Sequence, residues 1–197
     1  LAVADLVIEA VFEDLAVKQE VFRRIDAHAR PGAVLASNTS YLNVNEIAAT
    51  TKRPQDVLGM HFFSPANVMK LCEIVRGEKS AFDAIQTAIT VGRRIAKVPV
   101  IVGVCYGFVG NRMLHRRGVQ ADRLALEGAL PQEVDAATLE FGFPMGPFAM
   151  GDLAGIDVSL EDFHHALEQE GCIRVALVAL DEGIVAFRLC LLDFFGN

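Results

Sequence analysis

Val57-Leu58-Gly59-Met60-His61-Phe62-Phe63-Ser64-Pro65 begins as an apolar run and ends in polar residues, and Val34-Leu35-Ala36-Ser37-Asn38-Thr39-Ser40 has the same pattern. Short apolar runs bounded by turn residues predict buried strands. Ligands bind at strand ends in open α/β sheets, so His61 and the hydroxyl cluster at 37–40 are candidates for a site. A third short strand, 71–75, carries Glu73, a carboxylate placed to orient the histidine.

The composition narrows the class of protein. The chain has 197 residues, 52% of them hydrophobic, which is enough for one domain or two small ones. Its net charge of -7 and pI near 5.2 argue against a nucleic-acid partner. No uncharged apolar run reaches membrane-spanning length, so no membrane association is predicted. The chain starts inside an apolar run without Met or a basic segment, which indicates a fragment rather than a signal peptide.

The cysteines and histidines do not predict a metal or disulfide framework. Four widely spaced cysteines form no CxxC pair, which favours a reducing, cytoplasmic location. His164, His165 and Cys172 are the only candidate metal ligands, and nothing supplies the rest of a site.

Strands and helices alternate in the first half of the chain, which predicts an α/β sheet with right-handed crossovers. Strands are expected at 6–11, 33–36, 57–63, 71–75 and 98–104, and helices at 14–28, 45–50 and 80–96. Pro99 marks the last strand as an edge. In the first helix the apolar residues Leu15, Val17, Val21, Phe22 and Ile25 are expected to face inward, with Lys18 on the polar side.

Helices alone are expected further along, at 108–127, at 131–140 and from 145 to about 155. The predicted organisation is therefore a sheet domain at 1–104, a smaller all-α domain at 105–158 and an unassigned tail at 159–197. In that tail, 172–195 fits either an amphipathic helix pair or strands. The G-x-G-x-x-G fingerprint that opens a dinucleotide-binding domain is absent from the sequence.

Six segments occur together and in order. They are Asp5–Val11, Ala36–Ser40, Gly59–Pro65, Val68–Val75, Gly107–Arg112 and Gly142–Phe148. Together they resemble the L-3-hydroxyacyl-CoA dehydrogenase family, and most of all the dehydrogenase part of multifunctional fatty-acid β-oxidation enzymes. The resemblance covers about 4–158. It implies a partial Rossmann-type sheet domain, whose glycine-rich βαβ unit would lie upstream, followed by a helical domain that mediates homodimerisation.

The resemblance also implies a reaction and roles for residues. The family oxidises the 3-hydroxyl of an acyl-CoA to a ketone with NAD. His61 matches the catalytic base, and imidazole is well suited to proton transfer near neutral pH. Glu73 matches its carboxylate partner. Ser40 matches the serine on the reacting oxygen, and Asn111 matches the asparagine that positions the substrate.

Cofactor contacts follow from the same resemblance. Glu13 and Lys18 match residues near the nicotinamide half of NAD. Ser40 and Ser64 are assigned to the cofactor as well, although Ser64 stands where the stand-alone enzyme often has Asn. This gives an NAD-dependent oxidoreductase acting on 3-hydroxyacyl-CoA as the leading hypothesis.

Other interpretations remain open at this point. The chain could be a catalytically inactive folding or dimerisation module, or a related hydroxy-acid dehydrogenase. Ser37 and Asn38 could simply shape a turn, and Glu13 and Lys18 could form a solvated helix start. Glu9 fits a structural role in its strand as well as a cofactor role. Surface positions are expected for Lys70, His28, His115, His164 and His165.

Overall fold

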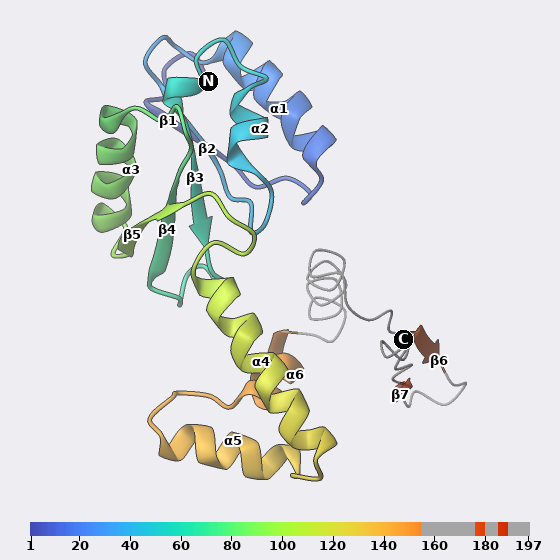
Figure 1. Cartoon of the computed structure of the whole chain (residues 1–197). Coiled ribbons are helices and arrows are strands. Elements are labelled where there is room, and N and C mark those ends of the chain that lie inside the picture. The colour runs from blue at the N-terminus through green and yellow to red at the C-terminus, as the bar shows by residue number, and fades with distance from the viewer. Residues whose placement is uncertain (155–175, 180–184, 189–197) are drawn as a thin grey trace, which may run out of the picture. The chain divides into compact units, whose positions relative to one another are not determined.

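The computed structural model describes residues 1–154, 176–179 and 185–188. Within them the chain forms two compact units, Leu1–Leu114 and His115–Asn197. The first unit holds the five-stranded sheet (Figure 1). Its strands lie in chain order: β1 (Leu6–Glu9), β2 (Val34–Ser37), β3 (Val57–Phe62), β4 (Leu71–Arg76) and β5 (Val98–Gly103). The predicted edge position of β5, the strand that contains Pro99, is confirmed.

One strand reverses the direction of the sheet. β1, β2 and β3 are parallel, β4 is antiparallel to β3, and β5 is parallel to β4. The sequence pattern predicted crossovers throughout the sheet, and this prediction is wrong between β3 and β4. The link at 63–70 contains no helix, and a parallel crossover needs a dozen or more residues.

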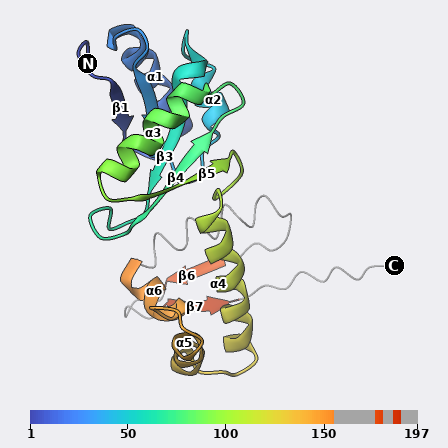
Figure 2. The same ribbon diagram turned by 90° about the vertical axis from the view of Figure 1, so that its left-hand side faces the viewer.

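Helices cover both faces of the sheet (Figures 1 and 2). α1 (Leu15–His28) and α2 (Val44–Ala48) lie on one face, and α3 (Phe82–Arg94) lies on the other. A short 3-10 turn, η1 (Pro54–Asp56), leads into β3. Two buried clusters result, because alternate residues of a strand point to opposite faces. One joins Phe22 and Ile47 to Leu35 and Val57, and the other joins Ile85 to Leu58 and Ile74.

Helix α1 buries a residue that its sequence pattern placed on the polar side. Lys18 is completely buried, whereas Val17 is 42% exposed. The prediction for these two residues is therefore wrong. The physical reason is Glu9 at the end of β1, which offers the Lys18 ammonium a buried carboxylate partner. The helix begins as expected, because the Asp14 side chain accepts a hydrogen bond from the Val17 amide at 2.9 Å.

The helical segments follow the sheet. α4 (Gly110–Leu126) runs across the boundary between the two units, and α5 (Pro131–Glu140) and α6 (Pro147–Ala154) belong to the second. Asp135 of α5 accepts hydrogen bonds from the Phe148 and Ala149 amides, both at 2.9 Å, and so caps the start of α6. Gly146 allows this contact, since a Cβ there would collide with the Asp135 side chain.

The described part of the tail consists of strands. β6 (Ala176–Ala179) pairs antiparallel with β7 (Val185–Arg188), so strands are found where a helix pair was the other possibility. His164, His165 and Cys172 lie outside the described residues. No helix within the described ranges combines the length and the apolar character needed to cross a membrane.

Candidate active site

Polar side chains end three neighbouring strands on one face of the sheet. Glu9 is the last residue of β1, Ser37 is the last of β2, and His61 is the second-last of β3. Strand alternation places them on the same face as Leu35 and Val57, which pack against α1 and α2. The site is therefore at the carboxyl end of the parallel strands, where ligands bind in open α/β sheets.

His61 and Glu73 form a buried pair across β3 and β4. The two residues stand opposite each other in the antiparallel register. His61 Nδ1 lies 2.9 Å from Glu73 Oε2, and the side chains are 4% and 1% exposed. A carboxylate accepts a hydrogen bond, so Nδ1 carries the proton in neutral imidazole and Nε2 keeps its lone pair. Within the described residues Nε2 makes no hydrogen bond, and it is therefore the nitrogen that can receive a proton.

The other oxygen of Glu73 binds the beginning of α4. Glu73 Oε1 accepts hydrogen bonds from the Val109 and Gly110 amides at 3.0 and 2.9 Å. Burial raises the pKa of Glu73, but the hydrogen bonds with His61, Gly110 and Val109 outweigh burial and hold the pKa below its ordinary value. Glu73 is therefore kept ionised, which favours the proton on Nδ1 of His61 and stabilises an imidazolium there.

Aromatic rings surround the imidazole. The ring centroids of Phe63 and Phe108 lie 4.4 and 5.8 Å from that of His61. A Cβ on Gly110 would collide with the Phe63 ring, so this glycine lets the ring and the helix start approach closely. Phe108 has a positive φ of 44°, which turns the chain between β5 and α4 toward Glu73.

The segment 37–40 forms a turn beside the end of β3. Asn38 Oδ1 accepts the Phe62 amide at 2.8 Å, and Ser37 Oγ donates to the buried Glu9 carboxylate. These bonds support a turn-shaping role for Ser37 and Asn38. Among the described residues Ser40 Oγ makes no hydrogen bond and the side chain is half-buried, which leaves the hydroxyl available to a ligand.

Glu13 and Lys18 are joined to this turn. Glu13 Oε1 accepts bonds from Thr39 Oγ1 at 2.5 Å, from the Ser40 amide at 2.7 Å and from the Tyr41 amide at 3.2 Å. Lys18 Nζ lies 3.3 Å from Glu13 Oε2. Because Lys18 is fully buried, the solvated-helix interpretation is wrong for this residue. Glu13 keeps 36% of its side chain exposed.

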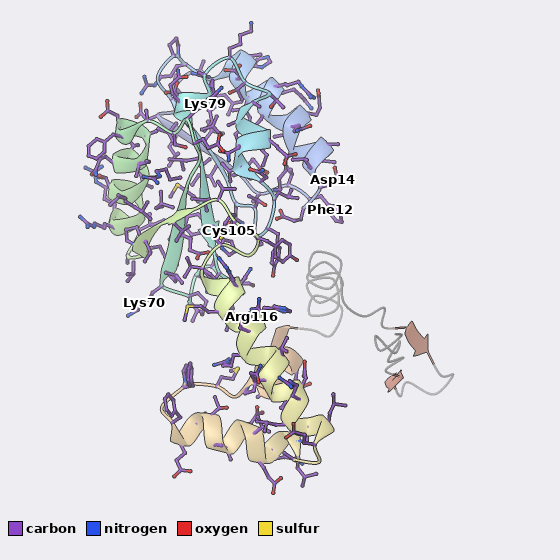
Figure 3. All side chains as sticks on the ribbon, in the orientation of Figure 1. Phe12, Asp14, Lys70, Lys79, Cys105 and Arg116 are labelled. Carbon is purple, nitrogen blue, oxygen red and sulfur yellow. The ribbon has the colours of Figure 1, made fainter. Side chains whose placement is uncertain are left out.

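The remaining candidates lie at the border of this site. Asn111 is half-buried in the first turn of α4, directly after Gly110. Ser64 is exposed, in the loop that follows β3. Lys70 is exposed and points away from the sheet (Figure 3), as expected for a surface lysine.

Sequence reasoning missed several contributors to the site. It did not identify the amide donors of Val109 and Gly110, the aromatic pair around His61, or the partner that Glu9 gives to Lys18. The Glu9–Lys18 contact could have been found from Glu9 itself, a charged residue inside the apolar strand 6–11. A buried carboxylate requires a partner.

The residues present fit part of a dinucleotide. The free Ser40 hydroxyl and the half-exposed Glu13 carboxylate suit the hydroxyl and amide groups of a nicotinamide riboside. No glycine-rich G-x-G-x-x-G loop is present to hold a pyrophosphate. Within the described ranges no group of three or more His, Cys, Asp or Glu side chains could hold a metal ion.

Two family models match the chain. The family model described as "3-hydroxyacyl-CoA dehydrogenase, NAD binding domain" matches 1–105, and the C-terminal domain model of the same family matches 107–183. The peroxisomal bifunctional enzyme of Danio rerio is 57% identical over 154 residues, which is 78% of this chain and 21% of that protein. The chain thus spans about a fifth of the length of the curated relatives it matches.

Solved structures show the same likeness. The 3-hydroxybutyryl-CoA dehydrogenase of Escherichia coli K12 has a TM-score of 0.81 and 37% identity, covering 86% of this chain and 36% of that one. The dehydrogenase part of multifunctional enzyme 1 from C. elegans has a TM-score of 0.61 and 32% identity, covering 85% and 38%.

The fold and the family models define an NAD-binding α/β unit of Rossmann type. The chain belongs to the 3-hydroxyacyl-CoA dehydrogenase family. The predicted family, its NAD cofactor, and the likeness to multifunctional fatty-acid oxidation enzymes are confirmed.

Proposed function

We propose that the site oxidises the 3-hydroxyl of an L-3-hydroxyacyl-CoA to a ketone with NAD. The buried His61–Glu73 pair is the observation that carries the proposal. His61 Nε2 takes the hydroxyl proton, and Glu73 stabilises the imidazolium that forms. NAD, when bound, accepts the hydride that leaves C3. The reverse reaction returns the proton from His61 to the oxygen of the ketone.

Ser40 and Asn111 hold the substrate in this proposal. The Ser40 hydroxyl donates to the reacting oxygen, and its lack of a hydrogen-bond partner within the described part of the chain supports that role. The Asn111 amide, one residue from an amide that binds Glu73, assists from α4. Glu13 and Ser64 contact the cofactor, as the resemblance implies. Lys18 lies next to Glu13 and belongs to the same cofactor contact, as the resemblance implies.

The test is reduction of acetoacetyl-CoA by NADH with the purified chain, followed at the nicotinamide absorbance band. We expect His61→Gln to lower kcat by at least about a hundredfold, the low end of what a general acid–base contributes. The matched control is His28→Gln, because His28 is exposed on α1 and should leave the rate unchanged. An unchanged rate in His61→Gln refutes the assigned base.

A non-catalytic folding or dimerisation module is the second candidate. Calorimetry with NADH separates the two. No heat of binding together with no turnover would reject an autonomous enzyme in favour of the module. Binding followed by turnover of a different 2- or 3-hydroxy acid, and not of acetoacetyl-CoA, would favour the related dehydrogenase.

We further propose the predicted organisation: a sheet domain at 1–104, a helical domain at 105–158 that forms a homodimer, and a separate tail at 159–197. Exposed apolar side chains on the helices, or directly after one, support dimerisation: Leu126 is 68% exposed, Phe141 83% and Leu153 73%. Light scattering after size exclusion should then give twice the chain mass. Phe141→Asp should shift the protein to the monomer without loss of helix content.

A reducing compartment is part of the proposal. Burial raises the pKa of the Cys72 thiol to about 11, only partly offset by Lys97, so this thiol is a packing residue and not a disulfide former. Cysteine use predicts a cytoplasmic location, whereas the relative from Danio rerio is named as peroxisomal. The location therefore stays a prediction. Imaging of the tagged full-length protein against a peroxisomal marker distinguishes the two locations.

A further inference from the structure

A continuous series of charged side chains leads from the end of β1 to the turn that contains Ser40. Glu9 is 5% exposed, and its carboxylate oxygens both lie 3.2 Å from Lys18 Nζ. Lys18 Nζ also donates to the Val11 carbonyl at 3.1 Å and lies 3.3 Å from Glu13 Oε2. The opposite oxygen of Glu13 accepts the Ser40 amide at 2.7 Å.

Glu9 and Lys18 form the buried end of this series of charged side chains, and every hydrogen-bonding group there is satisfied. The ammonium of Lys18 has three donors; it donates to both oxygens of Glu9 and to the Val11 carbonyl, and it forms an ion pair with Glu13. Glu9 also accepts from Ser37 Oγ and from the Val11 amide, the latter at 3.0 Å. A buried charge left without its partner is strongly destabilising. Glu9 therefore fixes the position of the Lys18 ammonium, and the ammonium in turn fixes the position of the Glu13 carboxylate.

Glu13 in turn fixes the backbone of the turn. Its Oε1 receives Thr39 Oγ1 and the amides of Ser40 and Tyr41. The ion pair between Lys18 and the other oxygen helps to hold the carboxylate in this position. Ser40, by contrast, has no side-chain partner among the described residues, so its hydroxyl direction depends on the backbone bonds to Glu13.

We infer that the buried Glu9 is a positioning residue for the Ser40 hydroxyl, acting through Lys18 and Glu13. This rests on the proposed function, in which Ser40 binds the reacting oxygen. It gives Lys18 a further task, the alignment of Glu13, beside the cofactor role that the resemblance implies. Glu9 itself touches neither substrate nor cofactor.

Amide hydrogen exchange measured by NMR on the ¹⁵N-labelled full chain tests the inference without any activity. The Ser40 and Tyr41 amides both donate to Glu13. A hydrogen bond to a charged group contributes about 1.5–3 kcal/mol, so releasing Glu13 should speed local exchange by about ten- to a hundredfold. We expect this acceleration in Glu9→Gln. The Met60 amide in β3 serves as the internal reference and should change only if the whole sheet is destabilised.

Two further variants make the test specific. Glu20→Gln is the matched control, because Glu20 lies on the same helix α1 but is exposed and pairs with Arg23. This variant should leave Ser40 exchange unchanged. Glu13→Gln changes the half-exposed member of this series of charged side chains. By itself it should speed exchange of the Ser40 and Tyr41 amides. If Glu9 acts through Glu13, the double variant Glu9→Gln/Glu13→Gln should exchange no faster than the faster single variant. Independent, multiplying effects would overturn the inference.

Activity gives the second readout. In an active protein Glu9→Gln should lower kcat for acetoacetyl-CoA by about tenfold or more, because Ser40 no longer orients the reacting oxygen. KM for NADH should rise as well, because the displaced Glu13 also contacts the cofactor in the proposed function. The pH profile should keep its shape, since the His61–Glu73 pair is untouched. An inactive wild-type chain would reject the proposed function alone. Unchanged Ser40 and Tyr41 exchange in Glu9→Gln would overturn the positioning inference whatever the activity.

Discussion

Glu73 is the side chain on which most of the site depends. One oxygen binds His61 and the other binds two amides at the start of α4. A buried carboxylate needs such partners, because burial without them costs several kcal/mol. The same bonds that make burial tolerable keep the group ionised, and an ionised Glu73 selects the tautomer of His61 that can accept a proton.

The lowered pKa of Glu73 gives stability a predictable pH dependence. A carboxyl whose pKa is depressed in the folded state stabilises the fold above its unfolded pKa, and this contribution disappears as pH falls through the folded value. We expect Glu73→Gln to reduce the free energy of unfolding by about 2–4 kcal/mol at pH 7. The deficit should shrink as pH falls below the ordinary value of 4.5. Urea unfolding at pH 7 and pH 3.5 measures both differences, and a deficit of equal size at the two values would contradict the assignment.

The element that completes the site is the beginning of α4. The chain leaves β5, turns through Gly107 and Phe108, both with positive φ, and enters the helix with its free amides directed at Glu73. Free amides at a helix N-terminus favour a negative charge. Gly110 combines two requirements there, because it donates one of these amides and leaves space for the Phe63 ring.

Gly110→Ala should therefore be harmful although alanine is the better helix former. The new Cβ would force Phe63 away or displace the amide from Glu73, and over-packing of this kind costs about 1–3 kcal/mol. We expect a lower midpoint of urea unfolding and a loss of turnover in a chain that is active. Gly118→Ala, at a position in α4 with open space around it, is the matched control and should stabilise the helix slightly. Equal behaviour of the two variants would show that the Phe63 contact is unimportant.

At the level of the molecule, periodicity predicted most of the sheet unit. Apolar runs such as 57–63 and the break at Pro31-Gly32 locate strands and helices within a few residues. Periodicity cannot report strand direction, so the reversal at β4 was missed; it follows from the short link at 63–70. It also cannot foresee that Lys18 is buried, because this depends on Glu9 from a different element. The His61–Glu73 pairing was expected from the carboxylate on the strand 71–75 and from the family resemblance, and the antiparallel register of β3 and β4 supplies its physical basis.

The edge strand β5 leads to a prediction about association. Val98, Val100 and Ile101 are 55%, 41% and 52% exposed on this edge, and apolar edge strands promote pairing between molecules. We expect Ile101→Lys to lower concentration-dependent light scattering while the melting temperature stays within a few degrees, because the side chain is already half in solvent. Thr90→Lys, an exposed change on α3, controls for added charge. Equal improvement in both variants would point to net charge and not to the edge.

The double use of Glu73 also decides where the chain can be recombined with a relative. A chimera joined between β5 and Gly110 would take the carboxylate from one parent and its amide donors from the other, so small differences in backbone path would reach the histidine directly. A junction after Asn111 keeps both halves of that contact from the same parent. Shuffled libraries of this family should therefore recover working members far more often with the second crossover point than with the first.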